Sequence, residues 1–360
     1  MLNIVRSWIH KYFSDEEAII LFLLLVAGLA GVLLLGPYLK PVFAAVVIAY
    51  ILQGLVAKLE RLHVPHLVSV TLVFLVFVGL TLTFTLGLLP LVSRQTSALV
   101  QELPAMLANL KTWIRALPEA YPQFVSAELV DALIRQITTD LTSTTQELLS
   151  FSLAKIISGI PALISFLIYA ILVPILVFFF LKDREAIVRS LSALLPKQRT
   201  LMKQVWADAN RQFANYIRGK VLEIFIVGGA TYIAFAFLGL NYAALLSILV
   251  GLSVVIPYIG AAVVTVPVAL IGAFQFGWTH DFFWVMALHL LIQGLDGNVL
   301  VPLLFSEVVN LHPVVIIIAV LLFGGLWGLW GVFFAIPLAT LIKAIIKAWP
   351  VKGTPPEGQH

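Results

Sequence analysis

The stretch VVIPYIGAAV, Val254 to Val263, places a proline and a glycine inside an unusually apolar part of the chain. The 57 residues from Ile224 to His280 contain no Asp, Glu, Lys or Arg. In lipid, a backbone group freed by a helix break costs several kcal/mol, so a break is tolerated only where protein or a water-filled cavity covers it. We therefore expect a helical hairpin whose tip, around Pro257 and Gly260, lies inside the membrane beside a protected polar space.

The composition places the whole chain in a membrane. Of its 360 residues, 61% are hydrophobic and 11% are charged, whereas soluble domains contain roughly 25% charged residues. The net charge of +4 suits an anionic inner leaflet better than a nucleic acid, and zero cysteines exclude thiol chemistry. The sequence predicts an all-α polytopic membrane protein, with the lipid bilayer as partner and no nucleic acid.

No enzyme motif accompanies this composition. The chain has no Walker A loop, no GxGxxG after a strand and no GxSxG turn. His63 and His66 lack a plausible third ligand nearby, so we expect no metal and no cofactor.

Uncharged runs predict about six full transmembrane helices, because a helix needs about 20 residues to cross a bilayer. Segment 91–155 instead has polar and apolar residues at helical spacing, with Pro104, Pro118 and Pro122 as breakers. It is expected to form amphipathic helices outside the membrane. The predicted spans are 18–39, 41–57, 67–90, 156–181, about 221–239 and about 282–304.

Charge predicts the orientation. Segment 182–220 carries nine Lys and Arg in 39 residues, and 91–155 carries five in 65. The denser segment is expected in the cytoplasm, which places 91–155 in the periplasm and both termini inside. The expected regions are 1–90 (transmembrane helices 1–3), 91–155 (periplasmic), 156–220 (transmembrane helix 4 and a basic connector), 221–349 (transport core) and 350–360 (tail).

Two broken segments define the expected core. The first hairpin, 242–277, begins with Tyr242–Ile256, which is too short to cross. The second, 311–346, has a glycine series midway and Pro337 beyond it. Counting spans makes the two hairpins enter from opposite sides, a pattern that points to a transporter site near the midplane. Alternatively, both are ordinary crossings whose small residues allow close helix packing.

Polar residues lie between the hairpins. His289, Gln293 and Asp296 occur at i, i+4 and i+7, on one helical face. An ionisable side chain inside a span is costly and faces a cavity or a partner. Asp296–Gly297–Asn298 is expected to break the helix before Pro302, so that the site binds a small polar solute or a hydrated cation. A buried hydrogen-bond network joining helices is the structural alternative.

Glu223 lies one turn into the fifth span, after Arg218 and Lys220. It either pairs with those bases or carries protons. The residues expected to couple protons or ions are Asp296, Glu223 and His289. The expected solute-binding residues are Pro257, Tyr258, Gly260, Gln293, Asp296, Asn298, Pro302, Gly325 and Gly328.

Several motifs, in order, resemble the autoinducer-2 exporter (AI-2E) family, and within it the PerM-like permease branch. They are NYIRGKVLE (215–223), IPYIGAAVVTVP (256–267), GNVLVPLLF (297–305), NLHP (310–313) and GVFFAIPLATLIKA (331–344). The resemblance implies inner-membrane homopentamers in which two re-entrant hairpins surround the solute and each protomer moves in an elevator-like manner. The matching family positions are Arg218, Gly219, Pro257, Tyr258, Gly260, Asn298, Pro302, His312, Pro313 and Pro337.

The resemblance also bears on function. Some members are described as exporters of autoinducer-2 and others as sodium/proton antiporters, and Asp296 stands where many members carry Glu. Three functions stay open from the sequence: export of a small solute, sodium/proton antiport, and a non-transporting oligomeric scaffold that binds an envelope partner.

Overall fold

The computed structural model describes residues 16–120, 126, 128, 130–131, 134, 159–193, 195, 200–257, 259–305 and 311–349. Within these ranges every element is a helix. Seven helical segments are long and apolar enough to cross a membrane. The expectation of an all-α polytopic membrane protein is therefore confirmed.

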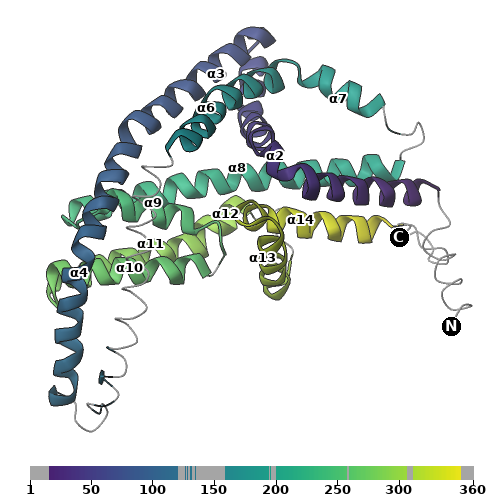
Figure 1. Ribbon diagram of the computed structural model, residues 1–360. Helices are drawn as coiled ribbons and strands as arrows, with labels where there is room; N and C mark the ends of the chain where they lie inside the picture. The colour runs from purple at the N-terminus through teal and green to yellow at the C-terminus, as the bar shows by residue number, and fades with distance from the viewer. Residues whose placement is uncertain are drawn as a thin grey trace, which may run out of the picture.

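Three helices form an arch at the top of Figure 1: α2 (Glu16–Arg61), α3 (His66–Thr83) and α6 (Gly159–Lys182). The predicted spans 18–39 and 41–57 match two candidate membrane spans, Ile19–Gly36 and Tyr38–Arg61, which are joined in one continuous helix, α2. Figure 1 shows that α2 changes direction part-way along its length. A proline inside a helix, such as Pro41, lacks the backbone N–H donor and so permits a bend. The arch cluster of buried residues comprises Ala45, Ala49, Val56, Val70, Val73, Val173, Val177 and Leu181.

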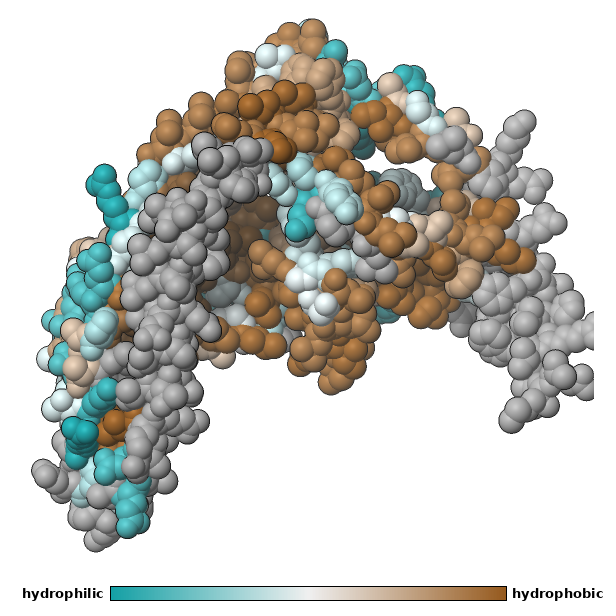
Figure 2. All heavy atoms as spheres, viewed as in Figure 1, coloured by the Kyte–Doolittle hydropathy of each residue, from teal (hydrophilic) through white to brown (hydrophobic). Residues whose placement is uncertain are grey.

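The end of α3 continues through a π-helical turn, η1 (Phe84–Leu88), into α4 (Leu89–Ala120). Pro104 and Pro118, expected as breaks, lie inside α4, because neighbouring turns hold the helix across each missing donor. Figure 2 shows hydrophilic residues gathered along α4, which agrees with the amphipathic pattern expected there. Pro122 and most of the remaining residues to 155 lie outside the described part, as does the tail.

The long helix α8 (Thr200–Phe237) follows the short α7 (Arg184–Ala193). It merges the second half of the expected basic connector with the fifth span, which were expected as separate elements. Its first turn is stabilised from outside, because the Glu17 carboxylate accepts a hydrogen bond from the Met202 backbone N–H at 3.1 Å.

Both predicted hairpins exist as pairs of helices. The first is α9 (Ala243–Ser253) with α10 (Ile259–Phe276), and the second is α13 (Pro313–Trp327) with α14 (Leu329–Ala348). The first arm of each is short, as expected for the first hairpin, but α10 and α14 are each long enough to cross. Re-entrance therefore stays a prediction. Between the hairpins lie α11 (His280–Leu295), the π-helical η2 (Asp296–Leu300) and α12 (Val301–Phe305).

Each hairpin is closed by a glycine on its second arm. A Cβ added to Gly260 would lie 1.8 Å from the Ser253 carbonyl oxygen, and one added to Gly331 would lie 1.8 Å from that of Phe323. The NLHP motif starts the second hairpin, since the His312 side chain accepts a hydrogen bond from the Val314 N–H and Pro313 takes the first helical position.

The helix α8 packs against both hairpins. Its residues Val227 and Phe235 belong to a first-hairpin cluster with Leu246, Val250 and Val268. Its residues Tyr216 and Ile217 belong to a second-hairpin cluster with Phe305, Ile316, Ala319, Val320, Phe323, Ala335, Ile336 and Ala339. The two hairpins are therefore joined by α8, and Ile256 at the first tip also packs against the second-hairpin cluster.

Candidate functional site at the tip of the first hairpin

A lysine of α8 holds the tip of the first hairpin. The Lys220 ammonium is 2.6 Å from the Glu223 carboxylate oxygen Oε2 and donates to the Val254 carbonyl oxygen at 2.9 Å. Val254 is the C-terminal cap of α9, where helix carbonyls lack intrahelical partners and carry partial negative charge. Lys220 and Glu223 are 4% and 1% exposed. The ammonium therefore replaces water as the partner of the broken helix end.

The surroundings of this ion pair are aromatic on one side. The Lys220 ammonium lies 5.1 Å from the centre of the Phe305 ring, a distance at which a cation is attracted to the ring face. The Tyr216 ring lies beside the same phenylalanine, and its buried hydroxyl has no hydrogen-bond partner among the described residues. Tyr216, Lys220 and Glu223 occur at i, i+4 and i+7, so α8 presents them on one face.

Asp296 faces this cluster from η2, which packs against α8. Its carboxylate interacts electrostatically with both Lys220 and Glu223, and its buried oxygen Oδ1 has no hydrogen-bond partner among the described residues. The expected helix break at Asp296–Gly297–Asn298 is wrong, because the chain widens into a π-helical turn and continues as α12. Such turns are frequent at functional sites.

Asn298 has a local role. Its side-chain amide donates to the Gly294 carbonyl oxygen of its own helix at 2.8 Å. The side chain is exposed, and this bond ties the π-helical turn to the end of α11.

The cluster is unbalanced in charge. It holds the ammonium of Lys220 and the carboxylates of Glu223 and Asp296. The nearby Arg218 instead lies against α2, where its guanidinium is the closest group to a Cβ built on Gly54. Of the two bases expected to pair with Glu223, only Lys220 is shown paired with it among the described residues. An uncompensated buried charge costs several kcal/mol, so one further positive charge would neutralise the cluster.

His289 lies deeper between the helices and is fully buried. Its Nε2 is 2.9 Å from the Thr265 hydroxyl, which itself donates to the Ala261 carbonyl oxygen. A hydroxyl has a single proton, so His289 Nε2 donates and Nδ1 carries the lone pair. This Nδ1 and the Gln293 amide nitrogen have no hydrogen-bond partner among the described residues.

The structure brings together only part of the expected site. Glu223 and Asp296 meet at Lys220, and Pro257 and Gly260 lie at the adjacent hairpin tip, whereas Tyr258 lies outside the described residues. Pro302, in α12, and Gly325, in α13, are exposed. Gly328 turns the second hairpin with φ of 61°, a left-handed conformation that favours glycine.

Lys220, Tyr216 and Trp327 were not among the expected site residues. Lys220 was considered only as a partner of Glu223, although its spacing at i, i+3 places the two side chains together. Trp327, in the last turn of α13, keeps a buried indole nitrogen without a hydrogen-bond partner in the described part of the chain. No sequence pattern distinguishes Trp327, with its buried indole N–H, from neighbouring aromatic residues that only pack against other side chains.

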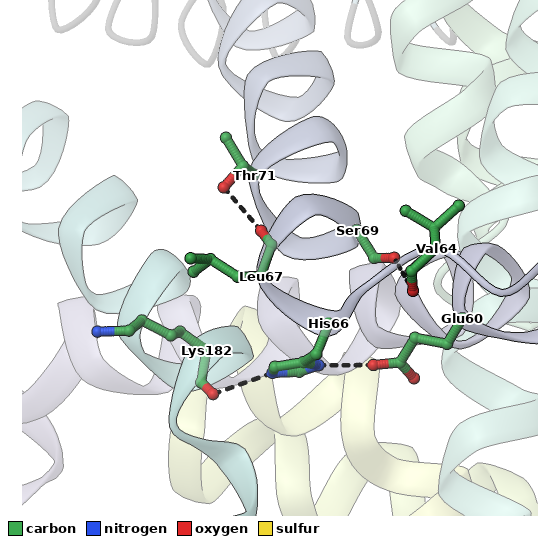
Figure 3. A network of polar contacts seen from close by, with 7 residues as sticks. All are labelled: Glu60, Val64, His66, Leu67, Ser69, Thr71 and Lys182. Carbon is green, nitrogen blue, oxygen red and sulfur yellow. Dashed lines mark hydrogen bonds and ion pairs between the residues drawn. The ribbon is translucent and has the colours of Figure 1, made fainter.

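His66 belongs to the arch and joins its three helices, as Figure 3 shows. Its Nδ1 is 2.5 Å from the Glu60 carboxylate at the end of α2, and its Nε2 is 3.1 Å from the Lys182 carbonyl oxygen at the end of α6. Both partners only accept, so the ring that makes both bonds is a charged imidazolium. His66 has a structural position, far from the hairpin cluster in sequence and in fold.

Polytopic helices, two hairpins against one shared helix, and ionisable groups buried beside a hairpin tip define a membrane transporter rather than a soluble binding protein. The family model described as AI-2E family transporter matches residues 22–351. The chain belongs to the AI-2E family.

Individual relatives agree with this assignment. The chain is 45% identical to "Putative permease PerM" of Escherichia coli (strain K12) over 350 residues, covering 97% of this chain and 98% of the relative. It is 26% identical to "Putative transport protein YueF" of Bacillus subtilis (strain 168), over 84% of this chain and 82% of that protein. It is 24% identical to "AI-2 transport protein TqsA" of Escherichia coli (strain K12), over 92% of each.

Proposed function

We propose that this transporter exports a small polar solute across the bacterial inner membrane by elevator-type alternating access, with the two hairpins as its moving walls. The observation that carries the proposal is Lys220, which joins the tip of the first hairpin at Val254 to the carboxylates of Glu223 and Asp296. A hairpin tip attached to a charge cluster responds to any ligand that changes the charge of that cluster.

The solute is expected to be small and polar, because the buried groups near the tip include hydrogen-bond donors and acceptors. Gln293 and Tyr216 can donate, and Asp296 and the lone pair of His289 can accept. The relative named as an AI-2 transport protein makes autoinducer-2 the first solute to test. Assembly as a homopentamer with both termini in the cytoplasm belongs to the same proposal, since the resemblance implies the former and the positive-inside rule supports the latter.

Cation/proton antiport is the second candidate. The observation that favours it is the charge imbalance of one ammonium against two carboxylates, which one proton or one sodium ion would remove. Under this candidate the cluster exchanges the two cations, and under the first it uses one of them to drive the solute. Both candidates place Asp296 at the step that takes up the cation.

Replacing Asp296 with asparagine is expected to reduce cation-driven flux at least about tenfold. The amide has nearly the same shape but carries no charge, so the cluster becomes neutral without an added cation and loses its coupling. The measurement is proton movement in proteoliposomes that enclose a pH-sensitive dye, under an imposed sodium or pH gradient. Autoinducer-2 efflux is followed in parallel.

Asp281→Asn is the matched control, since Asp281 is an exposed carboxylate at the start of the same helix segment. The control should retain the flux of the unmodified protein. Equal cation flux in Asp296→Asn and Asp281→Asn would contradict coupling at the cluster. Flux of neither cations nor solute in the unmodified protein would contradict transport and favour the scaffold.

A further inference from the structure

The amphipathic helix α4 contacts the first hairpin at its open end, opposite the tip that Lys220 holds. One side of α4 packs against the first-hairpin cluster through three residues that follow one another at seven positions, with Ala98 beside the middle one. From Val92 to Trp113 this side extends about 30 Å along the helix. Its packing residues are Val92, Ala98, Leu99 and Met106.

The first turn of α9 receives its cap from α4. The residue before α9 supplies no side-chain cap, although the first N–H groups of a helix need partners. The Leu245 N–H donates instead to the Gln95 side-chain oxygen at 2.8 Å. Two segments 150 residues apart are thus joined by a bond that local sequence supplies in most helices.

Two further contacts fix the same end. Tyr242 has φ of 59°, an uncommon conformation for a residue with a side chain. Its phenol donates to the Glu102 carboxylate; burial, together with this bond, raises the pKa of the phenol to about 12. Trp113 stacks on Phe274 of α10 with ring centres 5.6 Å apart and an interplanar angle of 13°. Both arms of the hairpin therefore contact α4.

The N-terminal end of α4 continues through η1 into α3, which belongs to the arch. Val70 and Val73 of α3 lie in the arch cluster, whereas Val92 and Leu99 of α4 pack against the first-hairpin cluster. The turn η1 separates these two packed regions, and none of its five residues is buried. A π-helical turn inside a helix is a site where the hydrogen-bond register changes and where bends concentrate.

We propose that α4 and the first hairpin form one rigid unit that turns about η1 relative to the arch, with Gln95 as the residue that positions α9 within the unit. Only the expectation that the hairpin moves rests on the proposed function. The attachment of α4 to the hairpin rests on the contacts at Gln95, Glu102 and Trp113. The extramembrane end of α4 would then report, or control, the position of the hairpin.

Gln95→Leu tests the attachment. The apolar side chain keeps the size of glutamine but cannot accept the Leu245 N–H, so amide hydrogen exchange in the first turn of α9 should accelerate about fivefold, as loss of a helix cap predicts. Gln95→Glu keeps an acceptor and should restore slow exchange. Gln101→Leu, on the exposed side of α4, should leave exchange unchanged. Equal exchange in all four proteins would overturn the capping role, whatever the transport activity.

Spin labels test the hinge, because the chain has no cysteine and labels attach only where one is introduced. Labels at Gln101 of α4 and Val266 of α10 report distances within the unit, and labels at Leu75 of α3 and Val266 report distances across η1. All three positions are exposed. Distances are measured at low and high pH and in Lys220→Met, which frees the hairpin tip.

The expected result is one unchanged distance distribution for the 101–266 pair and a shifted or second population for the 75–266 pair. A 101–266 distribution that changes as much as the 75–266 distribution would show that α4 and the hairpin move separately. Two fixed distributions under every condition would show that η1 is no hinge. Either outcome overturns the proposal, and neither depends on which solute is transported.

Discussion

Gly331→Ala is expected to prevent the second hairpin from closing and to lower the stability of the folded protein by about 3 kcal/mol or more, at the upper end of overpacking effects. The added Cβ would lie 1.8 Å from the Phe323 carbonyl oxygen and 2.5 Å from its carbonyl carbon. Both partners are backbone, so no side-chain rotation relieves the overlap. The arms α13 and α14 would have to separate, which exposes the buried Phe323 and Ala335 between them.

Thermal unfolding of the purified protein in detergent measures this loss, and size-exclusion chromatography shows whether the variant still assembles. Gly229→Ala is the matched control, since a Cβ at this exposed position of α8 meets nothing within 4 Å and alanine favours helix over glycine. Gly260→Ala should behave like Gly331→Ala, because its Cβ would lie 1.8 Å from the Ser253 carbonyl oxygen. A Gly331→Ala protein as stable as Gly229→Ala would contradict the close approach of the arms.

These glycines also show what the sequence could predict. The interruption at Pro257 and Gly260 and the later glycine series with Pro337 predict two hairpins, because few other residues permit a tight reversal in an apolar environment. The choice of Gly331 from four nearby glycines requires the position of Phe323 in space. The residues expected to bind solute at the second tip were Gly325 and Gly328. Gly328 forms the turn, and a Cβ added to Gly325 would meet no atom within 4 Å.

Helix boundaries were the weaker part of the sequence prediction. Pro104, Pro118 and the sequence Asp296–Gly297–Asn298 were interpreted as breaks, yet the helix α4 and the turn η2 continue through them. A proline removes one hydrogen bond, and a long helix packed against neighbours tolerates that loss as a bend. Hydropathy averages cannot distinguish a bent helix from two helices separated by a turn.

The candidate site was predictable where its members share a helical face. His289, Gln293 and Asp296 on one helix are found by the i, i+4, i+7 spacing, and Glu223 follows from a carboxylate inside a span. The bond from Lys220 to Val254 joins two elements across the fold, as does the bond from Leu245 to Gln95. No local pattern specifies such bonds, because each depends on the position that the tertiary fold gives to a helix end distant in sequence.

Lys220→Met is expected to destabilise the protein by about 3–5 kcal/mol, the usual cost of removing one partner of a buried ion pair. The substitution keeps an unbranched side chain of similar length but leaves the Glu223 carboxylate, which is 1% exposed, without its ammonium. It also leaves the Val254 carbonyl oxygen at the end of α9 without its donor. The measurement is unfolding of the purified protein by titration with a denaturing detergent.

Lys203→Met is the control, because Lys203 is exposed near the start of the same helix and surface charges contribute little to stability. Equal stability of Lys220→Met and Lys203→Met would contradict a structural role for the buried pair.

The double variant Lys220→Met/Glu223→Gln separates folding from coupling. It removes the positive and the negative charge together, so most of the lost stability should return, since a buried ion pair contributes little compared with uncharged groups of similar shape. A double variant no more stable than Lys220→Met would mean that the bond from Lys220 to Val254, rather than the pair with Glu223, holds the tip. If stability returns while cation-driven flux stays lost, the charged pair of Lys220 and Glu223 acts in transport as well as in folding, because the folded hairpin alone would then be insufficient for coupling.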